Sequence, residues 1–89
     1  MISFYKNKNI IITGHTGFKG SWLTLMLILL GSNVFGYSLK PKKLSLFSCL
    51  KLNKKLSGNK FSDIRNYNKL EKFIIKSNPD LIFHLAAQP

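Results

Sequence analysis

Residues 9–31, NIIITGHTGFKGSWLTLMLILLG, decide the fold of this chain. The β-branched run at 9–13 has no polar alternation, which predicts a strand that is buried on both faces. Residues 21–30 are apolar on nearly every side, and such a segment predicts a buried helix. Gly31 is suited to end this helix because glycine readily takes the left-handed conformation. Residues 14–20 therefore predict a glycine-rich turn that leads from the strand into the helix.

The turn carries three glycines at intervals of three residues, directly between the predicted strand and the predicted helix. Gly14 would let the chain turn sharply, Gly17 would let the backbone approach a pyrophosphate, and Gly20 would let helix and strand pack closely. The helix points its free N–H groups at such a turn, and Lys19 adds positive charge. The spacing predicts a phosphate-binding turn, with a turn that binds no ligand as the alternative. We expect His15 to lie beside the phosphates or in solvent.

The residues after this helix continue the alternation of short apolar blocks and helix-length segments that is typical of a parallel sheet. Residues 33–38 predict a second strand, in which Gly36 is a weak position. Pro41 interrupts the chain, and apolar residues at helical spacing within 46–50 predict a short helix. Residues 57–59 predict a turn.

Two further strands and one helix are predicted in the last third of the chain. Residues 60–62 and 81–85 read as a short third strand and a buried fourth strand. Asn66 can cap a helix between them. This helix should end before Pro79, because the residue before a proline disfavours helical geometry. Its apolar face would consist of Tyr67, Leu70, Phe73 and Ile74.

Length and cysteine content exclude several classes of protein. With 89 residues, of which 45% are apolar, the chain has room for one small domain and not for a complete two-domain enzyme. Cys49 is the only cysteine, so an internal disulfide is excluded, and a reducing compartment such as the cytoplasm is expected. We expect Cys49 to fill a small apolar space.

The formal net charge of +11 raises the question of a nucleic-acid or membrane partner. Arg65 is the only arginine among the 14 basic residues, whereas nucleic-acid recognition depends strongly on arginine. Scattered lysines favour solvated surfaces instead. The dense apolar run at 22–30 is about half as long as a membrane span requires. We therefore expect neither a nucleic-acid nor a membrane partner, and keep a nucleic-acid-binding peptide and a membrane-anchored or exported peptide as alternatives.

Five segments together resemble the extended short-chain dehydrogenases/reductases, and within them the CDP-glucose 4,6-dehydratases. The segments are TGHTGFKGSW (13–22), GYSL (36–39), SLF (45–47), SDIRN (62–66) and FHLAAQP (83–89). TGxxGxxG marks the extended group in general, whereas HTGFKGSW followed by HLAAQP is more selective. The resemblance covers the family's amino-terminal third. It implies an α/β fold, an incomplete Rossmann unit whose doubly wound parallel sheet has strand order 3-2-1-4, and one partial domain at residues 1–89.

The resemblance also implies a site for NAD. The pyrophosphate would be received by Gly14, Gly17 and Gly20 with the backbone of Phe18 and Lys19. Asp63 would accept a hydrogen bond from the adenine amino group, a role compatible with capping the following helix, and Ile64 would pack against the ring. The ribose and nicotinamide side would be lined by Ala86, Ala87 and Gln88. His84, in the predicted fourth strand, is expected to be a core histidine.

The expected strand order places the two ends of this site opposite each other. The crossover direction reverses between strands one and four, and ligands of doubly wound sheets lie at the carboxyl ends of the strands beside that reversal. Gly14 and Ala86 follow these two strands, so they should face each other. No acidic residue follows the second strand, where an NAD enzyme commonly has one. Lys42 and Lys43 lie nearby and would tolerate a 2′-phosphate, so NADP stays open as the cofactor.

The family's reaction uses bound NAD to oxidise the sugar at C4, eliminates water across C5 and C6, and returns the hydride to C6. A nucleotide sugar, CDP-glucose, is therefore the expected substrate, and another extended epimerase or dehydratase is the alternative. The family's Tyr-x-x-x-Lys pair and sugar-nucleotide lobe would lie beyond Pro89. We accordingly assign no catalytic residue and no metal ligand, expect the 89 residues alone to be inactive, and expect a homo-oligomer only at full length.

Overall fold

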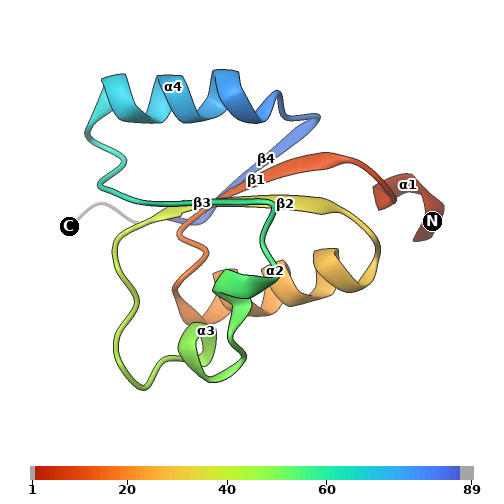
Figure 1. Cartoon of the computed structure of the whole chain (residues 1–89), viewed down its shortest axis with the longest axis horizontal. Coiled ribbons are helices and arrows are strands. Elements are labelled where there is room, and N and C mark those ends of the chain that lie inside the picture. Colours follow the sequence, from red (N-terminus) through yellow and green to blue (C-terminus); the bar gives the residue numbers. More distant parts are fainter. Residues whose placement is uncertain (1, 87–89) are drawn as a thin grey trace.

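The computed structural model describes residues 2–86 and contains one four-stranded parallel sheet with helices on both faces (Figure 1). The strands are β1 (Asn9–Thr13), β2 (Asn33–Ser38), β3 (Gly58–Phe61) and β4 (Leu81–His84). Their order in the sheet is β3-β2-β1-β4, and every neighbouring pair is parallel. The predicted α/β class and the strand order 3-2-1-4 are confirmed.

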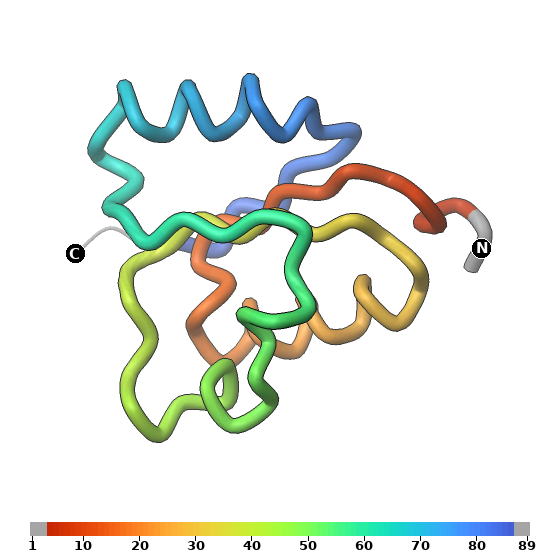
Figure 2. The backbone as a smooth tube through the Cα atoms, in the orientation of Figure 1, coloured from red at the N-terminus to blue at the C-terminus, as the bar shows by residue number. Residues whose placement is uncertain are grey.

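The helices divide between the two faces of the sheet. They are α1 (Ile2–Tyr5), α2 (Phe18–Leu29), α3 (Leu46–Cys49), the 3-10 turn η1 (Leu52–Lys54) and α4 (Tyr67–Ser77). Figures 1 and 2 show α2 and α3 on one side of the sheet and α4 on the other. The crossovers β1-α2-β2 and β3-α4-β4 therefore cover opposite faces, which is the arrangement of a doubly wound fold.

The centre of the core is β1, which lies between β2 and β4. Ile10, Ile11 and Ile12 have no exposed surface, which confirms the strand predicted to be buried on both faces. Ile10 and Ile12 pack with Leu27 of α2 and Val34 of β2. Burial of each of these isoleucine side chains contributes about 1.5–3 kcal/mol to the stability of the fold.

Helix α2 differs from the prediction in its start and in its burial. It begins at Phe18, three residues earlier than predicted. Only one face is buried, formed by Gly20, Ser21, Thr24 and Leu27. The expectation of burial on all sides was wrong, since Trp22, Met26 and Leu29 are exposed. The buried face therefore consists of three small residues and one leucine, while three of the larger apolar side chains point outward. Gly31 ends the helix with a φ of +88°, as predicted.

Cys49 is exposed at the end of α3. The expectation that it fills an apolar space was therefore wrong. Phe47 is the buried residue of this short helix, because its larger apolar side chain gains more from burial than a thiol does.

The two edge strands also depart from the sequence interpretation. Gly58 and Asn59, predicted as part of a turn, belong to β3 and pair with Phe35 and Gly36 of β2. Strand β4 was predicted to be buried, but its residues alternate between half-buried and exposed. Among residues 2–86 it pairs with β1 alone, so one edge and part of one face stay open.

Helix α4 follows the predicted signals at both ends. The Oδ1 atom of Asn66 accepts a hydrogen bond from the backbone N–H of Lys69 at 3.3 Å, which confirms the cap. Asn78 ends the helix with a φ of 47°, directly before Pro79. Tyr67 was expected on the apolar face, but 76% of its surface is exposed.

Asn9 joins three segments at the amino edge of the sheet. Its backbone N–H donates to Oδ2 of Asp80 at 2.8 Å, and its carbonyl accepts from the N–H of Asp80 at 2.6 Å. Its side-chain amide donates to the carbonyl of Asn78 and its side-chain oxygen accepts from Asn33. The starts of β1 and β2 and the turn before β4 are thus held together by one residue.

No helix within residues 2–86 is long and apolar enough to cross a membrane.

Candidate functional site

A pocket of about 280 Å³ lies at the carboxyl ends of the four strands. Its lining comes from four loops, each of which follows a strand. Five residues predicted for the nucleotide site line it together: Gly14, Gly17, Asp63, Ile64 and Ala86. Six further lining residues were missed by the sequence analysis: Thr16, Ser38, Leu39, Ser62, Arg65 and Leu85. Five of them follow a strand and Ser38 is the last residue of β2, so the rule that ligands lie at the carboxyl ends of strands could have found all six.

Gly14 brings the turn after β1 into contact with the segment after β4. Its φ is +80°, a conformation that residues with a Cβ rarely adopt. A Cβ at this position would lie 2.7 Å from the backbone nitrogen of Ala86 and 2.8 Å from the carbonyl carbon of Leu85. Gly14 and Ala86 therefore face each other, as the strand order predicts.

The other two glycines of the turn have different surroundings. Gly20 is buried behind the turn and lies outside the pocket, where a Cβ would collide with the carbonyl of Gly14 and the Cα of His15. Gly17 is exposed, and a Cβ there would meet only the carbonyl oxygen of Gly14, at 3.6 Å. Gly20 thus allows α2 to pack closely on the turn, while Gly17 leaves open space on the pocket side.

The start of α2 offers hydrogen-bond donors to this open space. Gly17 is the N-cap residue and makes no side-chain cap bond, and the first turn of the helix holds no acidic residue. Among the described residues, the N–H groups of Phe18, Lys19 and Gly20 have no backbone acceptor. Uncapped N–H groups at the positive end of a helix are suited to bind an anion.

A second hollow of about 460 Å³ adjoins the pocket and shares Thr16 and Gly17 with it. Phe18, 70% exposed, lines this hollow together with Lys40 and Lys42. The two lysines bring positive charge beside the start of α2. The predicted site residue Phe18 therefore lines the adjoining hollow and not the pocket, and Lys19 lines neither of them.

Thr16 fastens the turn to the end of β2. Its hydroxyl donates to the carbonyl oxygen of Leu39 at 3.0 Å and lies 2.9 Å from the hydroxyl oxygen of Ser38. These contacts hold the glycine-rich turn against the end of β2, where Ser38 and Leu39 also line the pocket.

His15 lies in the core, and the expectation that it lies beside the phosphates or in solvent was wrong. None of its surface is exposed, and its Nε2 atom lies 2.7 Å from Oδ1 of Asn59. Its ring stacks on Phe61 at 6.2 Å and meets the edge of Phe47 at 5.1 Å. Gly36 provides the space, because a Cβ there would overlap the imidazole ring. The His15 ring therefore explains why β2 has a glycine at position 36.

Burial also sets the charge of His15. Removal from water lowers the pKa of the imidazole to about 4, and the hydrogen bond with Asn59 opposes this shift only in part. The ring is therefore neutral at neutral pH. Its Nδ1 atom has no hydrogen-bond partner within residues 2–86. The geometry assigns His15 a structural role beneath the turn.

Asp63 and Arg65 form an ion pair at the other end of the pocket. Oδ1 of Asp63 accepts from the backbone N–H of Arg65 at 2.9 Å, and the guanidinium Nη2 lies 2.6 Å from Oδ2. Hydrogen bonds from Arg65 lower the pKa of Asp63 to about 2, so the carboxylate is charged and can only accept hydrogen bonds. The alternative role of Asp63 as a helix cap was wrong, because Asn66 caps α4.

The remaining predicted positions lie after or within β4. His84 is exposed, and its Nδ1 atom lies 2.6 Å from the hydroxyl of Thr13. The expectation of a core histidine was wrong because β4 is an edge strand in the part of the chain that the structure describes. Ala87 and Gln88 lie outside the described residues. Within residues 2–86, no three His, Cys, Asp or Glu side chains gather as a metal site would require.

Comparisons with known proteins agree with this geometry. The sequence profile of the GDP-mannose 4,6 dehydratase family matches residues 11–89. CDP-glucose 4,6-dehydratase of Salmonella typhimurium is 44% identical over 88 residues, which is 98% of this chain and 24% of that protein. The chain thus spans about a quarter of the length of this relative.

The solved structure of the epimerase Mth375 from Methanothermobacter thermautotrophicus is similar with a TM-score of 0.72 and 27% identity. The similarity covers 98% of this chain and 25% of that structure. The matched residues include the glycine-rich turn, the carboxyl ends of all four strands and the segment that faces Gly14. The chain belongs to the GDP-mannose 4,6 dehydratase family.

Proposed function

We propose that the pocket at the carboxyl ends of the strands binds the adenosine and pyrophosphate parts of NAD. The chain would then form the cofactor-binding part of a sugar-nucleotide 4,6-dehydratase whose substrate is CDP-glucose. The observation that carries this proposal is the uncapped start of α2 beside the open space at Gly17. A pyrophosphate placed there would neutralise the helix end without meeting a side chain.

The donors for the pyrophosphate would be the N–H groups of Phe18 and Lys19. They have no backbone acceptor among the described residues, and Lys19 adds a positive charge in the first turn of α2. Gly14 lets the turn lie against Ala86, so the chain on both sides of the pyrophosphate is held close to it.

The adenine end would be held by the loop after β3. The Asp63 carboxylate lines the pocket in its charged form and can accept a hydrogen bond from an amino group. Arg65 orients this carboxylate through its own hydrogen bonds. Ile64 lines the same pocket and offers an apolar contact for a ring. On the other side, Ala86, Ala87 and Gln88 would line the ribose and nicotinamide.

Bound NAD supplies a hydride acceptor at the sugar C4 and a hydride donor at C6, so no net oxidation results. The proposal of CDP-glucose as substrate rests on the 44% identity to the Salmonella enzyme. A sugar-nucleotide epimerase is the second candidate, because the structural similarity is to an epimerase. We assign the residues of the pocket and of the start of α2 to cofactor binding, and we assign no residue to catalysis. In a longer protein of this family we propose a cytoplasmic homo-oligomer that binds neither nucleic acid nor membrane.

Calorimetric titration of the 89-residue chain with NAD and with NADP tests the cofactor assignment. We expect saturable binding of NAD that is lost in Gly17→Asp, because a carboxylate at position 17 would repel the pyrophosphate. A clear preference for NADP would contradict the choice of NAD and would point to Lys40 and Lys42 beside the pocket.

Incubation with CDP-glucose and NAD tests the assignment of the chain to cofactor binding alone. We expect no 4-keto-6-deoxy product from the 89-residue chain. Formation of that product would contradict the proposal that the catalytic groups lie outside these residues.

A further inference from the structure

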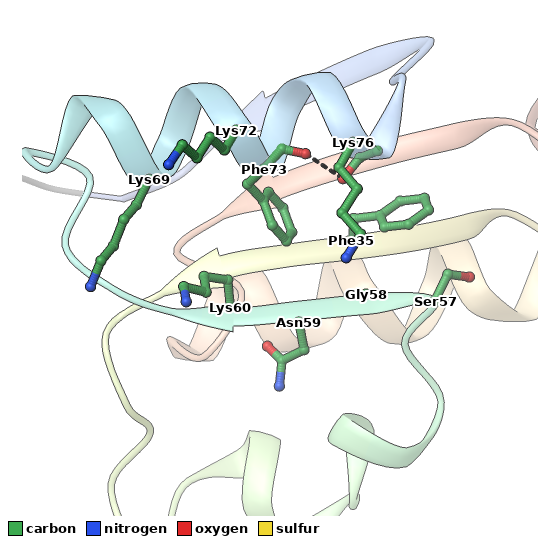
Figure 3. A pocket seen from close by; sticks show the side chains of 10 residues that line it. Phe35, Ser57, Gly58, Asn59, Lys60, Lys69, Lys72, Phe73 and Lys76 are labelled. Atoms are coloured by element: carbon green, nitrogen blue, oxygen red, sulfur yellow. Dashed lines mark hydrogen bonds between the residues drawn. The ribbon is translucent and has the colours of Figure 1, made fainter.

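A separate hollow of about 420 Å³ lies on the face of the sheet that α4 covers, between α4 and β3 (Figure 3). Two phenylalanines and four lysines form most of its wall: Phe35, Phe73, Lys60, Lys69, Lys72 and Lys76. It shares no lining residue with the pocket at the carboxyl ends of the strands. Nothing in the proposed cofactor site accounts for this hollow.

The apolar part of the hollow consists of two half-buried rings from different elements. Phe35 projects from β2 and lies over Gly58, where a Cβ would come within 2.5 Å of its ring. Phe73 points from α4 toward the sheet and contacts Tyr37 with 5.3 Å between ring centroids. Gly58 therefore lets Phe35 settle against β3, and two aromatic rings border one space.

The charged part surrounds these rings. Lys69, Lys72 and Lys76 are spaced three and four residues apart on α4, and Lys60 lies across the hollow on β3. Figure 3 shows Lys69 and Lys76 extending from α4 toward the sheet. Within residues 2–86 the ion pair found is Asp63–Arg65, so none of these four lysines is paired there. Like charges at this helical spacing destabilise a helix, and an anion in the hollow would remove that cost.

We propose that this hollow binds a small aromatic anion with two or more negative charges, of the nucleoside diphosphate class. Its ring would lie against Phe35 and Phe73, and its phosphates would contact the lysines of α4 and Lys60. The volume lies in the usual range of small-molecule sites. A second copy of this chain is a poor match for the four lysines, because the chain has 3 acidic residues against 14 basic ones. The proposal does not depend on NAD binding at the other pocket.

Titration of the isotopically labelled 89-residue chain with ADP, followed by amide NMR shifts, tests the proposal. We expect saturable shifts at residues 57–60 and 69–77, whether or not a second set appears at residues 14–17 and 62–65. Adenosine has the ring without the phosphates, and pyrophosphate has the phosphates without the ring. Each should therefore bind the hollow at least tenfold more weakly than ADP. Higher salt should weaken binding, because the lysines are exposed.

Two double variants with equal loss of charge locate the site. Lys72→Gln with Lys76→Gln should weaken ADP binding at the hollow about tenfold, or about 1.4 kcal/mol, because two exposed ionic contacts are lost. Lys54→Gln with Lys55→Gln, outside the hollow, should change it less than twofold. Shifts confined to residues 14–17 and 62–65, or equal weakening in both variants, would overturn the proposal. Unchanged NAD binding in the Lys72/Lys76 variant would separate this site from the cofactor pocket.

Discussion

The Nε2 atom of His15 lies 2.7 Å from Oδ1 of Asn59, and this contact joins the turn after β1 to the outer strand β3. The imidazole passes beneath Gly36 of the intervening strand β2. The glycine-rich turn therefore rests on a buried, neutral side chain, and the stability of the turn depends on the protonation of that side chain.

Acidification should destabilise the chain through His15. Its pKa is about 4 in the fold and about 6.5 in the unfolded chain. The unfolded state then binds more protons between these values, so this stability is present above pH 6.5 and is lost as the pH falls towards 4. We expect the free energy of unfolding to fall by about 1.5 kcal/mol between pH 6.5 and 5, measured by urea denaturation.

The other histidine provides the control for this pH dependence. His84 is exposed at the sheet edge, so His84→Gln should retain the decrease in stability between pH 6.5 and 5. His15→Gln should lose most of it. An unchanged pH dependence in His15→Gln would show that another group is responsible.

Gly36→Ala should destabilise the fold by about 1–3 kcal/mol, because the added methyl group would overlap the His15 ring in a packed interior. Gly17→Ala is the matched control. Its Cβ meets one atom at 3.6 Å, so the loss should stay below about 1 kcal/mol. Urea denaturation of both variants measures the difference. Equal stabilities would mean that the ring can move aside without cost.

Asp63→Ala should weaken NAD binding about tenfold, because it removes a charged acceptor that lines the pocket. Its effect on the free energy of unfolding should be small, since the Asp63–Arg65 pair is exposed to solvent. Glu71→Ala removes the same charge on α4 and should leave NAD affinity unchanged. Calorimetric titration distinguishes the two variants, and an equal loss of affinity in both would indicate a general effect of charge.

Asn66→Ala should lower the free energy of unfolding by about 1 kcal/mol, because the first turn of α4 loses its side-chain cap. Asn68→Ala, two residues further on the exposed side of the helix, should change it by less than about 0.5 kcal/mol. Thermal or urea unfolding followed by circular dichroism measures both. A neutral effect of Asn66→Ala would mean that water replaces the cap fully.

The first strand, the turn after it and the cap of α4 could be predicted because they follow from local signals, whereas the strand order was predicted from the resemblance to a known family. The isoleucine run of β1, the three glycines after it and the cap at Asn66 each specify their own backbone geometry. The rule for carboxyl ends of parallel strands then places Gly14 opposite Ala86. The strand, the turn and the cap need no knowledge of distant contacts, whereas the position of Gly14 opposite Ala86 also needs the strand order.

The burial of single side chains could not be predicted in the same way. His15 is buried because Gly36, Phe47, Asn59 and Phe61 surround it from three other segments, and no local pattern records their convergence. Trp22 and Met26 look like core residues, yet the small residues of α2 face the sheet. Hydropathy reports which residues are apolar, while packing decides which of them are covered.

Asn9 makes the two ends of the sheet unequal in their resistance to local opening. At the amino end, separation of β1 from the turn before β4 would break a set of hydrogen bonds that all meet at this one residue. At the carboxyl end the hydrogen bonds between neighbouring segments are spread over several residues, among them Thr13, Thr16 and Tyr37. Backbone amide exchange should therefore be slow around Asn9 and Asp80 and faster in the loops around Gly17 and Ile64. A ligand that binds at the carboxyl end can then displace these loops without changing the register of the strands.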